Sequence, residues 1–214
     1  MIKAVIFDLD GTLLDTLGDI AAAHNTGLRE LGFPERELSE FNHVIGSGIK
    51  EAIKKAAPSG ADDESLQKLL EMYQVNYPAR ATRLTRSYEG MTEALNTLAA
   101  SDKMLAVFTN KTEPIAIKLV RHYFPGIDFK FVWGNDGVRP LKPNAEAGKA
   151  ACGVLGLDPG EIAYVGDSDV DILFAFASGF LPVGACWGYR GRQELENTGA
   201  KKLAEKPLDI PELL

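Results

Sequence analysis

Two carboxylates separated by one residue follow the first apolar run of the chain. Asp8 and Asp10 come directly after residues 4–7, in the order Asp-Leu-Asp-Gly-Thr. If strand geometry persists, side chains two residues apart point the same way, and two like charges that close are unfavourable without a cation. A hard cation with oxygen ligands, Mg²⁺ above all, would relieve the repulsion. Alone, this pattern is as typical of a solvated turn as of a metal site.

A second acidic cluster follows a later apolar run, residues 162–165. It contains Asp167, Asp169 and Asp171, and the first and last of these are four residues apart. That spacing puts both side chains on one side of a helical turn. Neither acidic segment fits a calcium-binding EF-hand loop, since neither has a glycine at the sixth position. A metal site explains this concentration of acid better than solvation does.

Two other segments offer groups that bind anions. Thr109 and Asn110 end the apolar run 104–108, and the amides beyond them lead into a predicted helix N-terminus. A hydroxyl there could donate to a phosphate oxygen, although a plain helix cap is the alternative. Lys142 precedes Pro143 and another predicted helix. A single lysine is usually solvated, but a fixed ammonium is also what a transferring phosphoryl group requires.

Apolar runs and helical stretches alternate through most of the chain, and this alternation predicts the fold. The expected strands are 2–7, 104–108, 129–133, 162–165 and 181–184, and the expected helices are 91–100, 114–123, 145–155 and 170–177. Such alternation predicts an α/β fold with a doubly wound parallel sheet and right-handed crossovers. Ligands bind beyond the carboxyl ends of such strands, which is where all four polar segments lie.

Residues 16–81 interrupt this pattern. They show helical spacing, as at Ile20, Ala23 and Leu28, further helical segments near 50–57 and 62–77, and no convincing strand. We expect an all-helical cap at 16–81, inserted into a core of 1–15 and 82–214, with 78–88 as the return linker. Gly46, Ser47 and Gly48 lie between two helical segments. Their glycines would let backbone approach a ligand, or they form a simple turn.

The composition of the chain limits the kinds of partner and the cellular location that we expect. The chain has 214 residues and a formal net charge of −7, which argues against non-specific nucleic-acid binding. No apolar run is long enough to cross a bilayer, and no signal peptide is visible. Cys152 and Cys186 lack zinc-binding spacing and are too few for a disulfide framework, so we expect reduced thiols and a cytoplasmic location. The three histidines are expected to be hydrogen-bonded or solvated.

The four segments together resemble the ordered motifs of the haloacid-dehalogenase-like phosphatases. The resemblance covers residues 4 to about 190, and the family places a helical cap between its first and second motifs, as expected here. One departure lies at residues 144–147, Asn-Ala-Glu-Ala, where relatives often have a second proline and then an acid–proline pair. Residues 15–16, 45–48 and 187–190 resemble phosphoglycolate phosphatase-like members in particular.

The resemblance implies a mechanism. Asp8 would attack phosphorus and form an aspartyl-phosphate, and Asp10 would protonate the leaving alcohol and then deprotonate water. Thr109 and Lys142 would hold the phosphoryl oxygens.

It also implies the groups that bind metal and substrate. Asp8, the carbonyl of Asp10 and Asp167 would ligate Mg²⁺, with Asp171 as a supporting or water-mediated ligand. The substrate, a small phosphorylated metabolite, would contact Asn110 and the cap segment formed by Gly46, Ser47 and Gly48.

Other activities remain open at this point. Hexose-phosphate mutases of the same superfamily usually have a cap histidine where this chain has Ile20, and phosphonate hydrolases need a cap lysine, for which Lys50, Lys54 and Lys55 are candidates. Haloacid dehalogenases lack the second aspartate, so Asp10 counts against them. Pyrophosphate or nucleotide monophosphate hydrolysis and a non-enzymatic binding module are further alternatives. The sequence does not indicate an oligomeric state.

Overall fold

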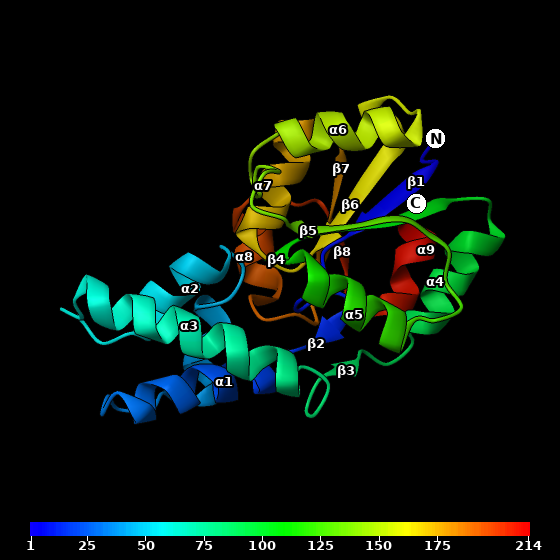
Figure 1. Ribbon diagram of the computed structural model, residues 1–214. Helices are drawn as coiled ribbons and strands as arrows, with labels where there is room; N and C mark the ends of the chain where they lie inside the picture. Colours follow the sequence, from blue (N-terminus) through cyan, green and yellow to red (C-terminus); the bar gives the residue numbers. More distant parts are fainter.

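Six parallel strands form one central sheet in the computed structural model, which describes residues 1–214 (Figure 1). Their order across the sheet is β5-β4-β1-β6-β7-β8. The strands are β1 (Ala4–Phe7), β4 (Met104–Thr112), β5 (Phe129–Asn135), β6 (Ile162–Gly166), β7 (Leu181–Ala185) and β8 (Lys202–Ala204). The expected α/β fold class is therefore confirmed, and all five predicted strands belong to this sheet.

The register of β1 brings the ends of three strands level. Phe7 pairs with Val107 of β4 on one side and with Val165 of β6 on the other. The chain proceeds from β1 outward through β4 and β5, and then returns to the opposite side of β1 for β6. A reversal of this kind leaves a crevice at the carboxyl end of the central strand. Asp8 is the first residue beyond that end.

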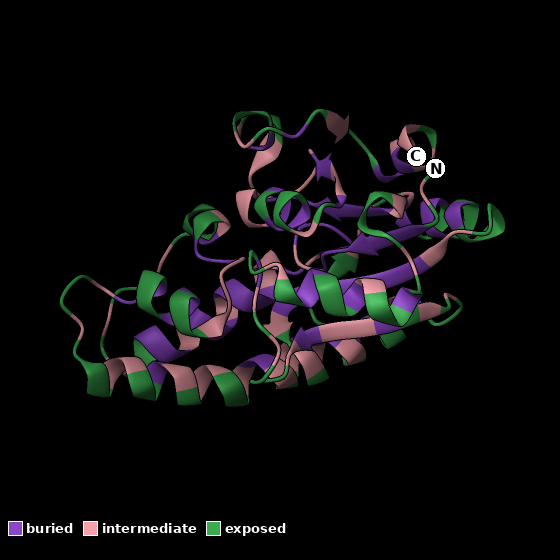
Figure 2. Ribbon diagram, turned by 90° about the horizontal axis from the view of Figure 1, so that it is seen from above, coloured by how far each residue is buried: buried purple, intermediate pink, exposed green.

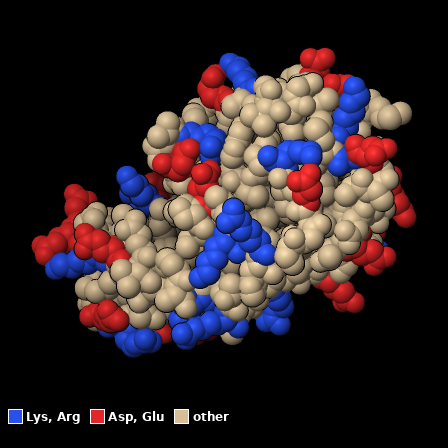
Figure 3. Space-filling view, turned by 45° about the vertical axis from the view of Figure 1, so that its right-hand side comes forward, with Lys and Arg blue, Asp and Glu red and all other residues tan.

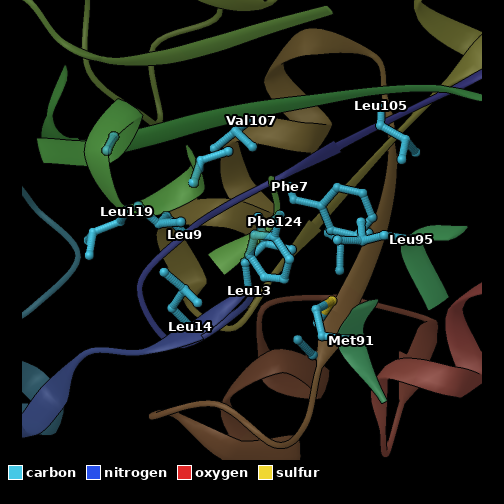
Figure 4. Close-up of a cluster of buried hydrophobic side chains, with 14 of the residues drawn as sticks. Phe7, Leu9, Leu13, Leu14, Met91, Leu95, Leu105, Val107, Leu119 and Phe124 are labelled. Carbon is cyan, nitrogen blue, oxygen red and sulfur yellow. The ribbon is translucent and has the colours of Figure 1, made fainter. Parts of the chain in front are cut away.

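Successive residues of the strands face opposite layers of helices, as the two-residue period of a strand requires. Val5 and Phe7 pack with α4 (Met91–Ala100), α5 (Glu113–Tyr123) and α9 (Ile210–Leu213), as part of the cluster in Figure 4. Ala4 and Ile6 pack with α6 (Glu146–Leu155) and α7 (Asp169–Ser178). The buried strands therefore lie between two helical layers whose outer faces are exposed (Figure 2).

The inserted helices form a separate layer beyond the carboxyl ends of the strands (Figure 1). They are α1 (Leu17–Glu30), α2 (Ile49–Ala56) and α3 (Asp63–Arg80), with a 3-10 turn at Leu38–His43. Leu28, Ile53 and Leu69 bring the three helices together in a small apolar cluster of their own. We call these helices and their connecting loops the cap.

A short two-stranded antiparallel ribbon marks the two crossings between core and cap. β2 (Leu14–Asp15) pairs antiparallel with β3 (Arg86–Ser87). Beside it, the buried carboxylate of Asp19 accepts hydrogen bonds from the backbone amides of Leu84 and Thr85, both at 2.9 Å. The outgoing and returning segments are thus bonded to each other. The boundaries at 15/16 and 81/82 fall at this junction and stay a prediction.

Some elements differ from the expectation. α3 continues to Arg80 although Pro78 was expected to begin the linker, because Tyr77 and Ala81 are buried in the core cluster and hold the last turn in place. The edge strand β8 and α8 (Gly191–Asn197) were not predicted, since both are short and polar. No helix combines the length and the apolar composition needed to cross a membrane.

Charges of both signs are spread over the surface. In Figure 3, acidic and basic side chains are interspersed among uncharged surface and touch in several places, with one group of basic side chains near the centre of the view. Most surface ion pairs join neighbouring residues, such as Lys68 with Glu64 at 2.6 Å. Such exposed pairs contribute little to stability, so the electrostatics that matter here lie in the interior.

His24 is buried in the cap, contrary to the expectation for the histidines. Its ring lies 4.5 Å from that of Tyr73 and 5.5 Å from that of Phe41, between ring centroids, and its Nε2 atom has no hydrogen-bond partner. Burial lowers the pKa of this imidazole to about 4. The folded protein therefore holds His24 neutral where the unfolded chain protonates it.

Replacing His24 with leucine tests this linkage. The unfolded state takes up the proton first as pH falls, so the wild type should lose stability relative to His24→Leu between about pH 6.5 and about pH 4, by up to about 3 kcal/mol. Denaturant unfolding of both proteins across this range measures the difference. His122→Leu, at an exposed position of α5, is the control. A constant difference between wild type and His24→Leu would contradict the prediction.

Candidate active site

Asp8 lies at the end of β1, where the chain turns sharply. The amides of Thr12, Leu13 and Leu14 all point to the carbonyl oxygen of Leu9, at 3.3, 3.1 and 3.0 Å. Gly11 has a φ of 83°, in the left-handed region that glycine adopts without strain. This turn leaves the Asp8 side chain at the crevice while the backbone is fixed on both sides.

Lys142 approaches Asp8 from the loop before α6. Its Nζ atom lies 2.8 Å from Asp8 Oδ1, 2.6 Å from Asp171 Oδ1 and 2.8 Å from the Tyr164 hydroxyl. The contacts with Asp171 and Tyr164 are hydrogen bonds and the contact with Asp8 is an ion pair, and the lysine side chain is only 2% exposed. Burial by itself lowers the pKa of Lys142, but Asp171 and Asp8 outweigh it and raise that pKa above its usual value. Lys142 is therefore a fixed positive charge beside Asp8.

Three buried carboxylates meet at this edge of the sheet. Asp8, Asp167 and Asp171 each offer an oxygen, and these oxygens lie within 4.8 Å of one another. Burial raises the pKa of Asp8 to about 6, opposed by Lys142 and reinforced by Asp171. Burial and the charges of Asp171 and Asp8 also raise the pKa of Asp167 well above its usual value. The protein alone thus leaves excess negative charge here.

The composition of the cluster fits a divalent cation. When ionised, the carboxylates of Asp8, Asp10, Asp167 and Asp171 face only two ammonium groups, those of Lys142 and Lys111. The two remaining negative charges equal the charge of one divalent ion, and an all-oxygen donor set suits Mg²⁺ or Ca²⁺. The Asp10 carboxylate is not a member of the close cluster.

Asp171 is oriented by the start of its own helix. Its Oδ2 atom accepts hydrogen bonds from the Ser168 amide at 3.0 Å and from the Ser168 hydroxyl at 2.6 Å. Because Oδ1 contacts Lys142, both oxygens already have protein partners. This geometry suits the supporting role expected for Asp171.

Two glycines enclose Asp167. A Cβ atom on Gly188 would lie 2.2 Å from the Asp167 Cβ, and one on Gly11 would lie 2.2 Å from its Oδ2. The Tyr189 amide donates to Oδ2 at 2.8 Å and the Thr12 hydroxyl to Oδ1 at 3.2 Å. The segment 187–189 therefore closes around the acidic cluster. Its sequence drew attention only by resemblance to relatives, since nothing in its spacing indicates a contact with residue 167.

Asp10 has partners that sequence reasoning missed. Thr16 Oγ1 donates to Asp10 Oδ1 at 2.6 Å, and Lys111 Nζ lies 2.8 Å from Oδ1 and 3.0 Å from Oδ2. Tyr189 in turn holds Thr16, whose amide donates to the tyrosine hydroxyl at 2.8 Å. Lys111 directly follows the predicted pair Thr109-Asn110, and that adjacency was the available signal.

Thr109 and Asn110 differ in whether their side chains keep a hydrogen-bond donor available to a ligand. The Thr109 hydroxyl oxygen accepts from the Lys111 amide at 3.3 Å, so its proton remains available to a ligand. The Asn110 side chain donates to the carbonyls of Gly46 and Lys142, at 2.9 and 3.1 Å, and accepts from the Lys142 amide at 2.8 Å. Asn110 thus ties the cap to the loop that contains Lys142.

A cleft of about 540 Å³, including its opening to solvent, separates Asp8 from the cap. Asp10, Thr109, Asn110 and Lys111 line its core side. Gly46 and Gly48 line its cap side as expected, together with apolar and aromatic side chains of the cap helices. Ser47 lines a separate surface hollow and not this cleft, and its Oγ lies 3.5 Å from Lys55 Nζ.

Comparison with known proteins identifies this arrangement. The model of the haloacid dehalogenase-like hydrolase family matches residues 5–184. The chain belongs to this family. A phosphoglycolate phosphatase of Nitrosospira multiformis is 36% identical over 200 residues, covering 91% of this chain and 88% of the relative. A phosphoglycolate phosphatase of Chromobacterium violaceum is 32% identical over 192 residues, covering 88% and 86%.

Solved structures of family members share both core and cap. A predicted phosphoglycolate phosphatase of Haemophilus somnus superposes with a TM-score of 0.91 at 27% identity, covering 99% of this chain and 97% of that one. A protein of Lactobacillus delbrueckii given the same activity superposes with a TM-score of 0.92 at 26% identity, covering 98% and 97%. This haloacid dehalogenase-like hydrolase thus has the fold of capped members along nearly its whole length.

The tight packing around Asp167 gives a testable prediction. Gly188→Ala would push a methyl group into Asp167, so it should destabilise the protein by about 1–3 kcal/mol and weaken divalent-cation binding. Gly153→Ala, where a Cβ would meet nothing within 4 Å, is the matched control and should be neutral or stabilising. Thermal unfolding and cation titration measure both effects. Unchanged stability and cation affinity in Gly188→Ala would show that the packing is not restrictive.

Proposed function

We propose that this protein hydrolyses the phosphate monoester of a small metabolite, with Mg²⁺, through an aspartyl-phosphate at Asp8. The observation that supports this most is the placement of Asp8, which is buried between a fixed ammonium and an acidic cluster at the base of the cleft. Two relatives named phosphoglycolate phosphatase match about nine-tenths of the chain. They make phosphoglycolate the first substrate to test.

Asp8 acts as the nucleophile. Its Oδ1 contacts Lys142, which orients the carboxylate and balances part of the charge of an approaching phosphoryl group. Attack of an Asp8 oxygen on phosphorus forms the acyl phosphate as the bond from phosphorus to the ester oxygen breaks. The Thr109 hydroxyl donates to a phosphoryl oxygen. Mg²⁺, held by Asp8, Asp167 and the Asp10 carbonyl, would supply further charge neutralisation at the phosphoryl oxygens.

Asp10 handles the proton in both halves of the reaction. Its side chain lines the same cleft as Asp8 and is held by Thr16 and Lys111. In its protonated form it donates the proton to the departing alcohol, and the resulting carboxylate, held by Lys111, later accepts a proton from the water that attacks the acyl phosphate. That water splits the phosphorus–oxygen bond to Asp8, releases inorganic phosphate and regenerates the free carboxylate.

The cap, proposed as residues 16–81, selects the substrate and excludes water. Gly46 and Gly48 contribute backbone to the cleft, whereas the side chain of Asn110 is fully bonded to the protein and positions the cap loop rather than the substrate. We infer a cytoplasmic location from the two free thiols, Cys152 and Cys186.

The lining of the cleft disfavours two of the alternatives. Ile20 occupies the cap wall where hexose-phosphate mutases usually have a histidine. None of Lys50, Lys54 and Lys55 lines the cleft over Asp8, and Lys54 is paired with the exposed Glu51 at 2.9 Å. A cap lysine for phosphonate chemistry is therefore not in reach of Asp8. An assay of released inorganic phosphate with pyrophosphate as the substrate would detect pyrophosphate hydrolysis.

Activity of the nucleophile variant tests the proposed function. The wild type should release inorganic phosphate from phosphoglycolate when Mg²⁺ is present and lose this activity with EDTA. Asp8→Asn should fold normally and lose activity by about 10³-fold or more, because the amide cannot attack phosphorus. The matched control is Asp128→Asn, at an exposed carboxylate. Turnover by Asp8→Asn close to that of wild type would refute the assignment.

The raised pKa values of the cluster predict how Mg²⁺ stabilises the protein. Without a cation the folded protein keeps Asp8 protonated up to about pH 6, whereas the unfolded chain ionises it at about pH 4, so stability falls as pH rises between these two values. A bound cation requires ionised carboxylates, so its stabilising effect should grow over the same range. The increase in melting temperature caused by Mg²⁺ should be larger near pH 7.5 than near pH 5, which lie about evenly above and below the raised pKa of Asp8. Asp167→Asn should abolish the increase, and an equal increase at both pH values would contradict the prediction.

A further inference from the structure

The cleft between Asp8 and the cap contains one basic side chain. Among the residues that line it, Lys111 is the only lysine, arginine or histidine. The cap wall opposite is apolar or aromatic, formed by Ile20, Ile45, Ile49 and Tyr77 among others. A charged group of a bound molecule would therefore find a single positive partner beyond the phosphoryl position.

Lys111 differs from Lys142 in the use of its donors. Lys142 is buried among Asp8, Asp171 and Tyr164, all three in contact with its ammonium, and it does not line the cleft. Lys111 contacts one carboxylate, that of Asp10, and its Nζ lies 4.5 Å from the centroid of the Tyr77 ring. An ammonium has three donors, and the two contacts with Asp10 leave one of them for a further acceptor.

Lys111 lies near the position that the leaving group of the ester must occupy. The phosphoryl group must meet Asp8, and the ester oxygen must meet Asp10, which protonates it. Lys111 Nζ lies 2.8 Å from Asp10, so a group one or two bonds beyond the ester oxygen comes within its reach. Its side chain is only 5% exposed, and water therefore screens such a contact little.

We propose that Lys111 binds a carboxylate on the leaving group and selects phosphate monoesters of short hydroxy acids. This inference rests on the proposed function. A buried carboxylate without a partner is strongly disfavoured, so the ammonium decides whether a charged leaving group is accepted. One ammonium shared with Asp10 is poorly matched to a second phosphate dianion. The tie between Asn110 and Gly46 brings the cap loop close above, which favours a short chain.

A matched pair of esters isolates the contact. Phosphoglycolate and 2-hydroxyethyl phosphate share a two-carbon skeleton. Phosphoglycolate has a carboxylate where 2-hydroxyethyl phosphate has a hydroxymethyl group. The wild type should prefer phosphoglycolate in kcat/KM. Lys111→Met should lower that preference by about 10²-fold, mainly through KM for phosphoglycolate, and Lys111→Arg should restore part of it. Lys54→Met, at an exposed cap lysine, should leave the preference unchanged.

The ratio of the two esters separates binding from other effects. Lys111 also contacts Asp10, so its loss can slow both reactions, but only a contact with the carboxylate changes their ratio. A wild type that hydrolyses both esters without preference would overturn the proposal, and so would a Lys111→Met protein with an unaltered ratio. The wild-type comparison holds even if the methionine variant fails to fold. Hydrolysis of neither ester with Mg²⁺ would instead reject the proposed function.

Discussion

The burial of several carboxylates at one edge of the sheet is the constraint that the rest of the structure serves. Asp8, Asp167 and Asp171 lie within 4.8 Å of one another, an arrangement that costs free energy without positive charge. Lys142 supplies part of it by contacting Asp8 and Asp171 together. The remaining negative charge favours the binding of a divalent ion at this edge of the sheet.

Keeping Lys142 in place requires contacts from several parts of the chain. Tyr164 of β6 accepts from its ammonium and donates to the carbonyl of Phe108 in β4. Asn110 bonds the backbone of Lys142 on both its amide and its carbonyl, and also reaches Gly46 of the cap. The position of the cap and the position of Lys142 beside Asp8 are therefore linked through the side chain of Asn110. A movement of the cap away from the core must break the bond between Asn110 and Gly46.

The sequence predicted those parts of the molecule that depend on local pattern. Buried runs such as Ala4–Phe7 and the helix Met91–Ala100 follow from continuous apolar stretches and from helical spacing. The antiparallel pair of β2 and β3, in which Leu14 pairs with Ser87, joins segments far apart in sequence. Each of its strands is only two residues long. Lys111 and Tyr189 act through partners that only the folded chain brings near. No spacing rule indicates such contacts.

Two lysine–carboxylate pairs face the reacting position, and their surroundings give them different capacities. The pair of Lys142 with Asp8 is closed, since the buried ammonium already contacts three protein side chains. The pair of Lys111 with Asp10 borders the cleft and has a donor to spare. A closed pair fixes a carboxylate in one orientation, whereas an open pair can bind a group that enters the cleft. In the proposed function, the Lys142 pair on the sheet side of the cleft serves the chemical step, and the Lys111 pair on the side that faces the cap serves substrate choice.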